Sequence, residues 1–408
     1  MKLITLTPIH IGSGESLKPL SYITDRNLLY VLDMDKFFAV LSEAQREIYL
    51  QWMDPILNRL AQLDERIAQA RADRNQKRRL QSQRREEEKK LSVRWFIENR
   101  LGQNPISFAK KCLAYQISYF ITPGRDGFKT HIKDTQNQAY IPGSEIKGAI
   151  RTSLLYTMLQ NGQNYKILKD SLTDFKSVLR SGKSPKKKIE KLKKLANAQD
   201  ENGLERKLLR GSKRDAKFDF LKFIRISDSS SIESQKLKIE TTQMLRTDRY
   251  TKTWVETIVP NTQLYFDFST QEKAFLDKLG LNGMKNWLSV PKLLEACHHR
   301  SKEILEEEER HFSDERNILE LIRRLKKENQ PTSPLLRLGA GQGFLGTTID
   351  LKVLKEDPQL YDEAIREGVS FQRRWRTQKG NFPKTRRVIV DSYNNPSAIL
   401  GWIKLLPD

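Results

Sequence analysis

A long stretch nearly free of helix-breaking residues places the strongest constraint on the fold of this chain. Between Ala44 and Arg100 there is no glycine and a single proline, Pro55. Apolar residues recur there at spacings of four and three, as along one face of an α-helix. They are Ile56, Leu60, Leu63, Ile67 and Ala70. The repeat covers only about two heptads, which is short for a coiled coil. We therefore expect 41–100 to form a helical hairpin inserted between core elements, with the later run "RRLQSQRREEEKK" as a solvated helix face rather than a binding site.

Segments of a second kind are rich in aromatic and β-branched residues, which predicts strands. They are "LITLTPIHIGSG" at 3–14, "KFDFLKFIRIS" at 217–227 and "TQLYFDFS" at 262–269. The basic stretch 181–217 fits a solvated insertion and a phosphate-tracking arm equally well. Strands mixed with helical insertions predict an α+β fold.

The charge balance indicates a polyanionic partner. The chain has 73 Lys and Arg against 51 Asp and Glu, a net charge of +22, which favours binding to RNA, DNA or an anionic membrane. A basic surface that only keeps the protein in solution is the alternative. No apolar run approaches the roughly 20 residues needed to cross a bilayer, so no membrane partner is expected. Two cysteines and no export signature predict a reduced, cytoplasmic protein.

The stretch "YIPGSEIKGAIRTSLLY" (140–156) has the features of a helix start. Pro142-Gly143 predicts a turn, and Ser144 follows where an N-cap residue belongs. Lys147 and Arg151 are four residues apart and share one helical face. The pattern fits a capped amphipathic helix with solvated cations, or a helix N-terminus and two cations aimed at a phosphate.

A second glycine-rich element, "LLRLGAGQGFLGTT" (335–348), contains a G-x-G-x-x-G pattern. It comes late and outside a βαβ unit, which disfavours a dinucleotide site. Closely spaced glycines allow backbone N–H groups to face phosphates, and Arg337 and Phe344 would add charge and a stacking surface for single-stranded RNA. A tight structural turn is the alternative. Further on, Trp375 lies among arginines, and "FPKTRR" adds more cations.

Together these motifs resemble a known family. "LTPIHIGSGE", "YIPGSEIKGAIRTSLLY", "RISDSS" and "LRLGAGQGFLGTT" resemble the RAMP superfamily of CRISPR RNA-binding proteins. The late loop with "FPKTRR…LGWIKL" is most similar to the subunit of type III-A (Csm) effector complexes that caps the filament at the 3′ end of the guide RNA (crRNA). Segments 41–100 and 160–215 carry no family motif and look like lineage-specific insertions.

The resemblance implies RRM-like (ferredoxin-like) modules, which we divide into 1–270, with insertions at about 41–100 and 160–215, and 271–408, with the glycine-rich loop 339–346. It implies binding to the 3′ region of crRNA, assembly with neighbouring Csm backbone subunits, and a role in crRNA maturation for antiviral defence. Target RNA and trimming nucleases are further candidate partners, and no cofactor is expected. The candidate RNA-binding residues are His10, Gly12, Ser13, Gly14, Ser144, Lys147, Arg151, Arg337, Gly339, Gly341, Gln342, Gly343, Lys384, Arg386 and Arg387.

Catalysis and metal binding are the competing hypotheses. His10 suits a general acid or base in metal-independent RNA cleavage, so a RAMP endoribonuclease that processes precursor crRNA is the main alternative. Related backbone subunits cut target RNA with a loop aspartate, but no motif marks Asp25, Asp33 or Asp35 as its counterpart. Cys297-His298-His299 is poorly spaced for a tetrahedral metal site, so we expect no metal and a structural role. A third hypothesis is a scaffold that binds only proteins.

Overall fold

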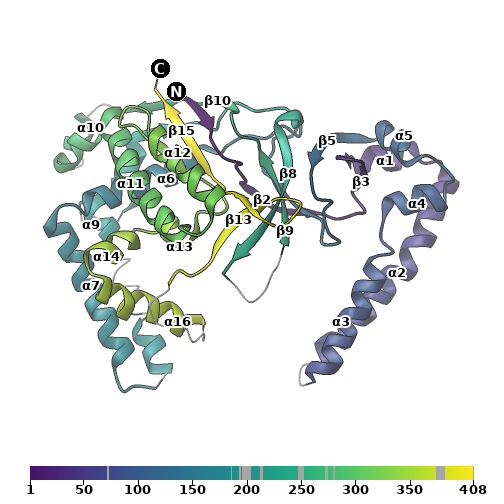
Figure 1. Cartoon of the computed structure of the whole chain (residues 1–408), viewed down its shortest axis with the longest axis horizontal. Helices are drawn as coiled ribbons and strands as arrows, with labels where there is room; N and C mark the ends of the chain where they lie inside the picture. Colours follow the sequence, from purple (N-terminus) through teal and green to yellow (C-terminus); the bar gives the residue numbers. More distant parts are fainter. Residues whose placement is uncertain are drawn as a thin grey trace.

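The computed structural model describes residues 1–70, 73–184, 186–192, 194, 204–211, 215–246, 252–271, 274–278, 281–373 and 382–407. Within these ranges the strands form three sheets, and helices cover them to give an elongated mixed α+β fold. A mainly helical body lies at one end of the molecule, and a long two-helix arm lies at the other (Figure 1). The predicted α+β class is confirmed.

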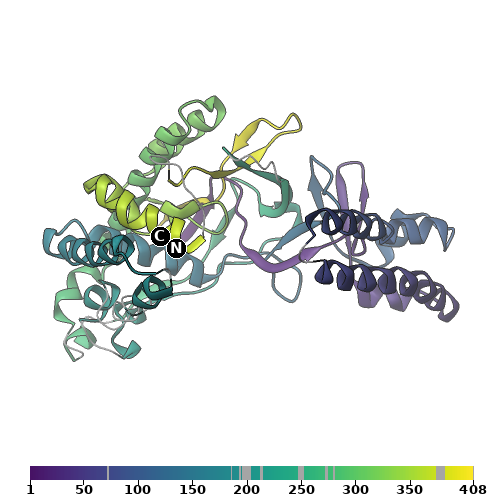
Figure 2. The same cartoon turned by 90° about the horizontal axis from the view of Figure 1, so that it is seen from below.

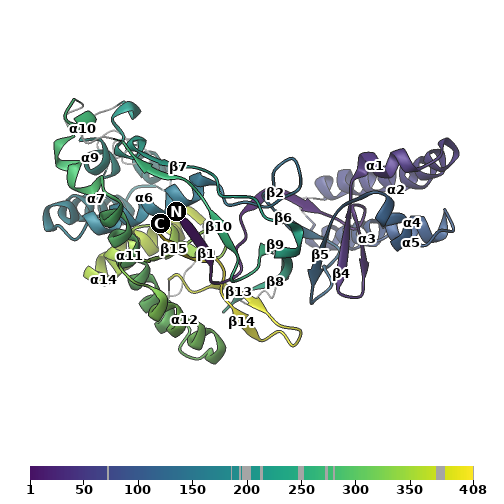
Figure 3. The same cartoon turned by 90° about the horizontal axis from the view of Figure 1, so that it is seen from above.

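A four-stranded antiparallel sheet in the body joins the two ends of the chain. Its strands, in the order β10-β1-β15-β12, are β10 (Gln263–Tyr265), β1 (Lys2–Thr5), β15 (Trp402–Leu406) and β12 (Leu335–Arg337). The two termini accordingly lie side by side (Figure 3). The division into 1–270 and 271–408 stays a prediction; strands from both segments share this sheet.

The larger sheet forms the middle of the molecule. Its main path is β2 (Gly12–Leu17), β6 (Phe128–His131), β9 (Lys252–Ile258), β8 (Leu237–Leu245), β5 (Leu113–Tyr119), β4 (Leu28–Leu32) and β3 (Tyr22–Asp25), and β13 (Arg386–Val390) pairs with both β8 and β14 (Pro396–Ala398). The pairs β5–β8 and β6–β9 are parallel, and the other pairs are antiparallel. This sheet places Gly12, Ser13 and Gly14 on an edge strand, β2, and His10 lies just before that strand.

The described helices of the body pack around the four-stranded sheet. They are α6 (Gly143–Met158), α7 (Gly162–Arg180), α9 (Leu204–Arg210), α10 (Ala274–Lys278), α11 (Val290–His311), α12 (Arg316–Glu328), α13 (Gly343–Thr347), α14 (Asp350–Glu356), α15 (Pro358–Leu360) and α16 (Glu367–Arg373). Along β15, Ile403 and Leu405 join the core cluster that contains the apolar face of α6, whereas Trp402 joins the cluster of α12. The body therefore has a packed core on each face of this sheet.

The arm confirms the helical prediction for 41–100. Helices α2 (Glu43–Gln69) and α3 (Arg74–Glu88) run side by side (Figure 2), and α1 (Met34–Val40), α4 (Val93–Asn99) and α5 (Pro105–Lys111) surround the base. The apolar repeat is divided between two clusters. Leu63 and Ala70 pack with Leu80 of α3, while Ile56 and Leu60 join an aromatic cluster over β3 and β4.

All three segments predicted as strands are only partly so. In 3–14, strand residues are limited to 3–5 of β1 and 12–14 of β2. In 217–227 only β7 (Ile224–Ile226) is a strand; before it the 3₁₀ turn η2 (Phe220–Phe223) begins after Asp219, whose side chain accepts the N–H of Leu221. The segment 262–269 is split between β10 and β11 (Phe268–Thr270), which belong to different sheets. The basic stretch 181–217 lies partly outside the described residues; α9 is in its described part.

Candidate nucleic-acid interface

The glycine-rich loop after β12 lies against the segment between β1 and β2. The N–H of Ala340 donates to the carbonyl oxygen of His10 over 2.8 Å. A Cβ on Gly339 would lie 2.2 Å from that same oxygen, and the φ of Gly339 is +62°, so glycine is required at this position. The fold therefore brings together two glycine-containing motifs from opposite ends of the sequence.

A cleft of about 380 Å³ opens beside this contact, and we call it the His10 cleft. Its lining includes Gly12, Gly14, Lys129 and Arg387. Gly14 has a φ of +92°, and nothing lies within 4 Å of the position its Cβ would take. Two cations beside an open stretch of backbone suit a phosphate-bearing chain. Glu15, also in the lining, is an acidic group that opposes an anion there.

His10 is buried at this cleft and is held in one tautomer. Its Nδ1 lies 2.7 Å from the carbonyl oxygen of Glu256, and because a carbonyl oxygen can only accept, Nδ1 carries the proton. Burial lowers the pKa of His10, the bond to Glu256 opposes this, and the charges of Lys129, Lys133 and Arg387 lower it further. The ring is therefore neutral near pH 7.

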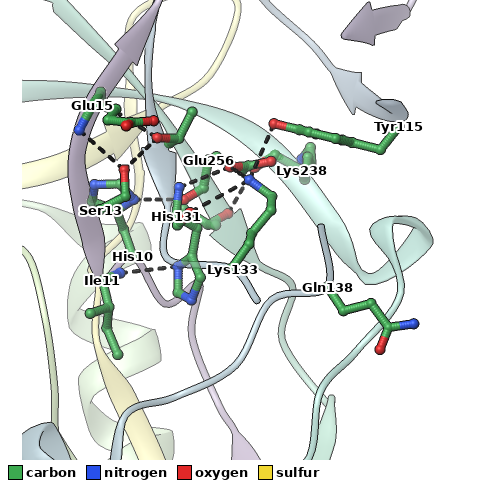
Figure 4. Close-up of polar contacts among 12 residues, drawn as sticks. His10, Ile11, Ser13, Glu15, Tyr115, His131, Lys133, Gln138, Lys238 and Glu256 are labelled. Carbon is green, nitrogen blue, oxygen red and sulfur yellow. Dashed lines mark hydrogen bonds and ion pairs between the residues drawn. The ribbon is translucent and has the colours of Figure 1, made fainter. Parts of the chain in front are cut away.

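Behind this histidine a buried polar network joins β6, β9 and the N-terminal segment (Figure 4). The fully buried Glu256 accepts the N–H of His131 over 2.8 Å and pairs with the ammonium of Lys133. The Nδ1 of His131 accepts the N–H of Ile11, and Nε2 donates to the carbonyl of Tyr140, each over 3.1 Å. His131 thus ties the N-terminal segment to the loop that leads into α6.

Ser13, predicted to face RNA, uses its hydroxyl within the edge of the sheet (Figure 4). Its Oγ lies 2.6 Å from the Oγ1 of Thr130 and accepts the N–H of Glu15 over 3.1 Å. These bonds fix the irregular part of β2, where the pairing with β6 shifts register. The residue remains exposed, so its backbone is open to a ligand while its side chain supports the strand.

A second cleft, of about 220 Å³, borders the same glycine-rich loop, and we call it the Ser144 cleft. Its lining includes Ser144 and Gly148 of α6 and Gln342 of the loop. Gly148 has open space around the position of a Cβ. The buried Arg300 of α11 donates to the carbonyl of Gly346 over 2.7 Å and so holds α13 against this cleft. Two predicted motifs, 140–156 and 335–348, therefore meet here.

Helix α6 does not begin as the sequence predicted. Pro142, rather than Ser144, is the N-cap residue, and the N–H of Gly143 donates to the carboxylate of Asp228 over 2.8 Å. A Cβ on Gly143 would lie 2.5 Å from the carbonyl oxygen of Ser227, so the glycine allows the 227–230 segment to approach. The helix start predicted to hold a phosphate already has a carboxylate partner from this chain.

The two cations of α6 are also engaged within the protein. The ammonium of Lys147 donates to the carbonyl of Ile224 over 2.7 Å. Arg151 pairs with Glu205 at 2.6 Å and with Asp219 at 3.4 Å. Neither side chain lines the Ser144 cleft. These contacts fasten α6 to α9, to β7 and to the segment before it. A phosphate contact of this pair stays a prediction.

Arg337 and Arg386, also predicted to face RNA, are buried and share one carboxylate. Glu308 of α11 pairs with Arg337 at 3.1 Å and with Arg386 at 2.6 Å. Arg337 donates further to the carbonyls of Gly341 and Leu400, over 2.9 and 3.1 Å. Burial opposes ionisation of Glu308, but the two guanidiniums hold its pKa below the ordinary value. Both arginines therefore support the glycine-rich loop and its surroundings. Arg337 also lines the Ser144 cleft, and the RNA contact of both residues stays a prediction.

The remaining predicted residues differ in exposure. Lys384 and Gly343 are exposed, whereas Phe344, expected to stack on bases, packs against Phe382 with ring centroids 5.0 Å apart. Trp375 lies outside the described residues.

No group of three His, Cys, Asp or Glu side chains in the described ranges is placed to hold a metal ion, and no described helix is long and apolar enough to span a membrane. Cys297 is buried. Sequence reasoning missed Lys129, Arg300, Glu308 and the role of Asp228. Lys129, Arg300 and Glu308 lie outside the motifs, so no sequence signal points to them. Asp228 lies in the "RISDSS" motif, and membership of that motif is the only sequence signal of its role.

The family follows from a match along most of the chain. A model of the RAMP superfamily matches residues 2–345. The chain belongs to the RAMP superfamily. This confirms the resemblance inferred from the motifs. The RAMP protein is 24% identical over 434 residues to the CRISPR system Cms protein Csm5 of Methanocaldococcus jannaschii, covering 99% of this chain and 88% of that protein. It is 26% identical over 283 residues to the Csm5 protein of Streptococcus thermophilus, covering 66% of this chain and 63% of that one.

Two solved structures share the fold of this RAMP protein. The crystal structure of T. onnurineus Csm5 superposes with a TM-score of 0.63 at 18% identity, covering 99% of this chain and 100% of the other. A chain of a Csm–crRNA–target RNA ternary complex of a type III-A CRISPR-Cas system, determined by cryo-electron microscopy, superposes with a TM-score of 0.60 at 18% identity, covering 98% of both chains.

Proposed function

We propose that this RAMP protein is a Csm5-like, crRNA-binding subunit of a type III-A CRISPR (Csm) effector complex. Similarity to Csm5 proteins along nearly the whole chain supports this, and one structural relative comes from a Csm–crRNA–target RNA complex. In this role the protein caps the filament of backbone subunits at the 3′ end of crRNA. The cap limits how far trimming nucleases reach and so influences crRNA maturation in antiviral defence.

The observation that carries this proposal is the seating of the glycine-rich loop on the His10 segment. This contact places the His10 cleft and the Ser144 cleft along one loop. Open glycine backbone with Lys129 and Arg387 beside it suits phosphate contacts that do not depend on sequence. The four-stranded sheet with helices α6 and α11 on one face supports RRM-like modules for the body.

Binding without catalysis fits the surroundings of His10. Acid–base cleavage of RNA commonly uses a second group that donates a proton to the leaving oxygen. His131, the neighbouring histidine, has both ring nitrogens engaged, and burial lowers its pKa to about 3, so it is unsuited to that role. An endoribonuclease with His10 as general base remains the alternative. It predicts cleavage in EDTA that is lost in His10→Ala.

The test measures affinity of the purified full-length protein for fluorescein-labelled single-stranded RNA at several salt concentrations. For single strands the slope of log Kobs against log salt is about −0.7 per neutralised phosphate. Lys129→Ala with Arg387→Ala should flatten the slope by up to about 1.4, because two cations of the His10 cleft are lost. Lys110→Ala with Lys111→Ala, two exposed lysines of α5 outside both clefts, removes equal charge and should leave the slope unchanged.

Either of two results would reject the proposal. Equal slopes for both double variants would remove the His10 cleft from the RNA site. Defined products on a denaturing gel, formed in EDTA and absent with His10→Ala, would make the protein a nuclease.

A further inference from the structure

We propose that His10 is a sugar-reading residue, whose Nε2 accepts a hydrogen bond from a ribose 2′-hydroxyl in the His10 cleft. This inference rests on the proposed RNA-binding function and adds to it a chemical basis for preferring RNA over DNA. The preference for RNA over DNA would depend on one atom, Nε2 of His10, whereas the neighbouring glycines would contact phosphates.

The first step of the argument is the proton on the ring. Because Nδ1 donates to the carbonyl of Glu256, the neutral ring presents Nε2 as an acceptor. Burial lowers the pKa of His10, which keeps Nε2 free of a proton near pH 7. A phosphate oxygen only accepts, so it has no hydrogen to offer this nitrogen. The ligand group that matches Nε2 must be a donor.

The second step is access. His10 lines the cleft, and within the described part of the chain Nε2 has no hydrogen-bond partner. A Cβ on Gly12 would lie 3.4 Å from Nε2, so glycine there keeps a side chain away from this nitrogen. The ring itself is held by its bond on the opposite side. Nε2 is thus a fixed acceptor that borders the His10 cleft from an otherwise buried ring.

The third step selects the donor. Lys129 and Arg387 line the same cleft and favour a phosphate nearby. The 2′-hydroxyl is the donor that every ribonucleotide carries next to its phosphate and that DNA lacks. Base N–H groups differ from one nucleotide to the next, so they do not suit a protein that binds RNA by its backbone. The 2′-hydroxyl is therefore the donor that fits this site.

The test uses two probes, a labelled twelve-nucleotide oligouridine RNA and the same strand with fluorine at every 2′ position. Fluorine removes the donor and preserves an RNA-like sugar conformation. The affinity ratio of RNA to fluorinated strand is measured for wild type and for His10→Asn. The asparagine amide is short enough to keep the bond to the Glu256 carbonyl, and it does not reach the position of Nε2.

We expect the ratio to fall by about 2- to 12-fold in His10→Asn, the range of one neutral hydrogen bond. His10→Gln, whose longer amide can place an acceptor near Nε2, should recover part of the ratio. An unchanged ratio in His10→Asn, with RNA still bound by wild type, would overturn this inference alone. Failure of wild type to bind RNA would overturn it together with the proposed function.

Discussion

Removing the shared carboxylate of Glu308 should destabilise the protein strongly. In Glu308→Gln, Arg337 and Arg386 would lose their only acidic partner among the described residues, while both guanidiniums stay buried. The side chains of all three residues are at most 4% exposed, so water cannot replace the carboxylate. Breaking a buried ion pair costs about 3–5 kcal/mol, because an uncompensated charge is left behind. We expect a loss in this range, with the glycine-rich loop affected first.

The assay is urea denaturation of both the wild type and Glu308→Gln, followed by tryptophan fluorescence. Glu309→Gln is the matched control: Glu309 is the next residue of α11, and its two cations, Arg323 and Lys326, are partly exposed. A surface pair is worth about 0–1 kcal/mol, so the control should lose little. A loss below about 1 kcal/mol for Glu308→Gln, or one equal to the control, would refute the reasoning.

The same carboxylate gives a pH dependence with a definite sign. The pKa of Glu308 is held below its ordinary value by the two guanidiniums, so the folded state binds its proton less readily than the unfolded state. Ionised Glu308 therefore contributes to the free energy of unfolding above its unfolded-state pKa of about 4.3. This contribution is lost as the pH falls through the pKa of Glu308 in the folded protein. The stability difference between wild type and Glu308→Gln should be constant above about pH 5.5 and shrink in acid.

Three further outcomes follow from single contacts. Gly339→Ala should weaken RNA binding and lower the melting temperature, because its Cβ would lie 2.2 Å from a carbonyl oxygen and its φ is +62°. Asp228→Ala should cost about 1 kcal/mol in chemical denaturation, since α6 loses a side-chain cap, whereas Asp228→Asn should cost less. Arg151→Ala should leave the salt dependence of RNA binding unchanged, because this cation is paired with Glu205 and Asp219; a flatter slope would restore it to the RNA site.

The parts of the fold that sequence predicted well depend on local chemistry. The arm follows from a long run that contains no glycine and a single proline, Pro55, which the structure places inside α2. Where the prediction failed, a distant partner decided. The first part of the strand expected at 217–227 is a 3₁₀ turn instead, because Asp219 caps it and Phe220, Leu221 and Phe223 are all buried. The local sequence pattern does not predict that neighbouring residues are all buried.

The start of α6 fails for a related reason. Ser144 has the right identity and position for an N-cap, but Asp228, far along the chain, supplies the carboxylate that bonds to the first N–H of the helix. A single sequence shows Ser144 as a capping residue next to the helix start, but it does not show that the fold brings Asp228 to the same place. The "RISDSS" motif was recognised as part of the family pattern, while its contact with the "IPGSE" motif became visible only in three dimensions.

Glycines and cations in the same motifs therefore differ in how far a sequence can predict their roles. Glycine is required at a contact such as that of Gly339 because a Cβ would collide with neighbouring backbone and because φ is positive. The role of an arginine depends instead on whether the fold pairs it with an acidic side chain, and Arg337 and Arg386 both form ion pairs with Glu308. Two other motif cations, Lys147 and Arg151, fasten α6 to its neighbours. Arg387, from the "FPKTRR" motif, lines the His10 cleft together with Lys129, which belongs to no motif. Under the proposed function, the RNA contacts of the His10 cleft therefore come mainly from the family motifs, and Lys129 is the one contributor that no motif marks.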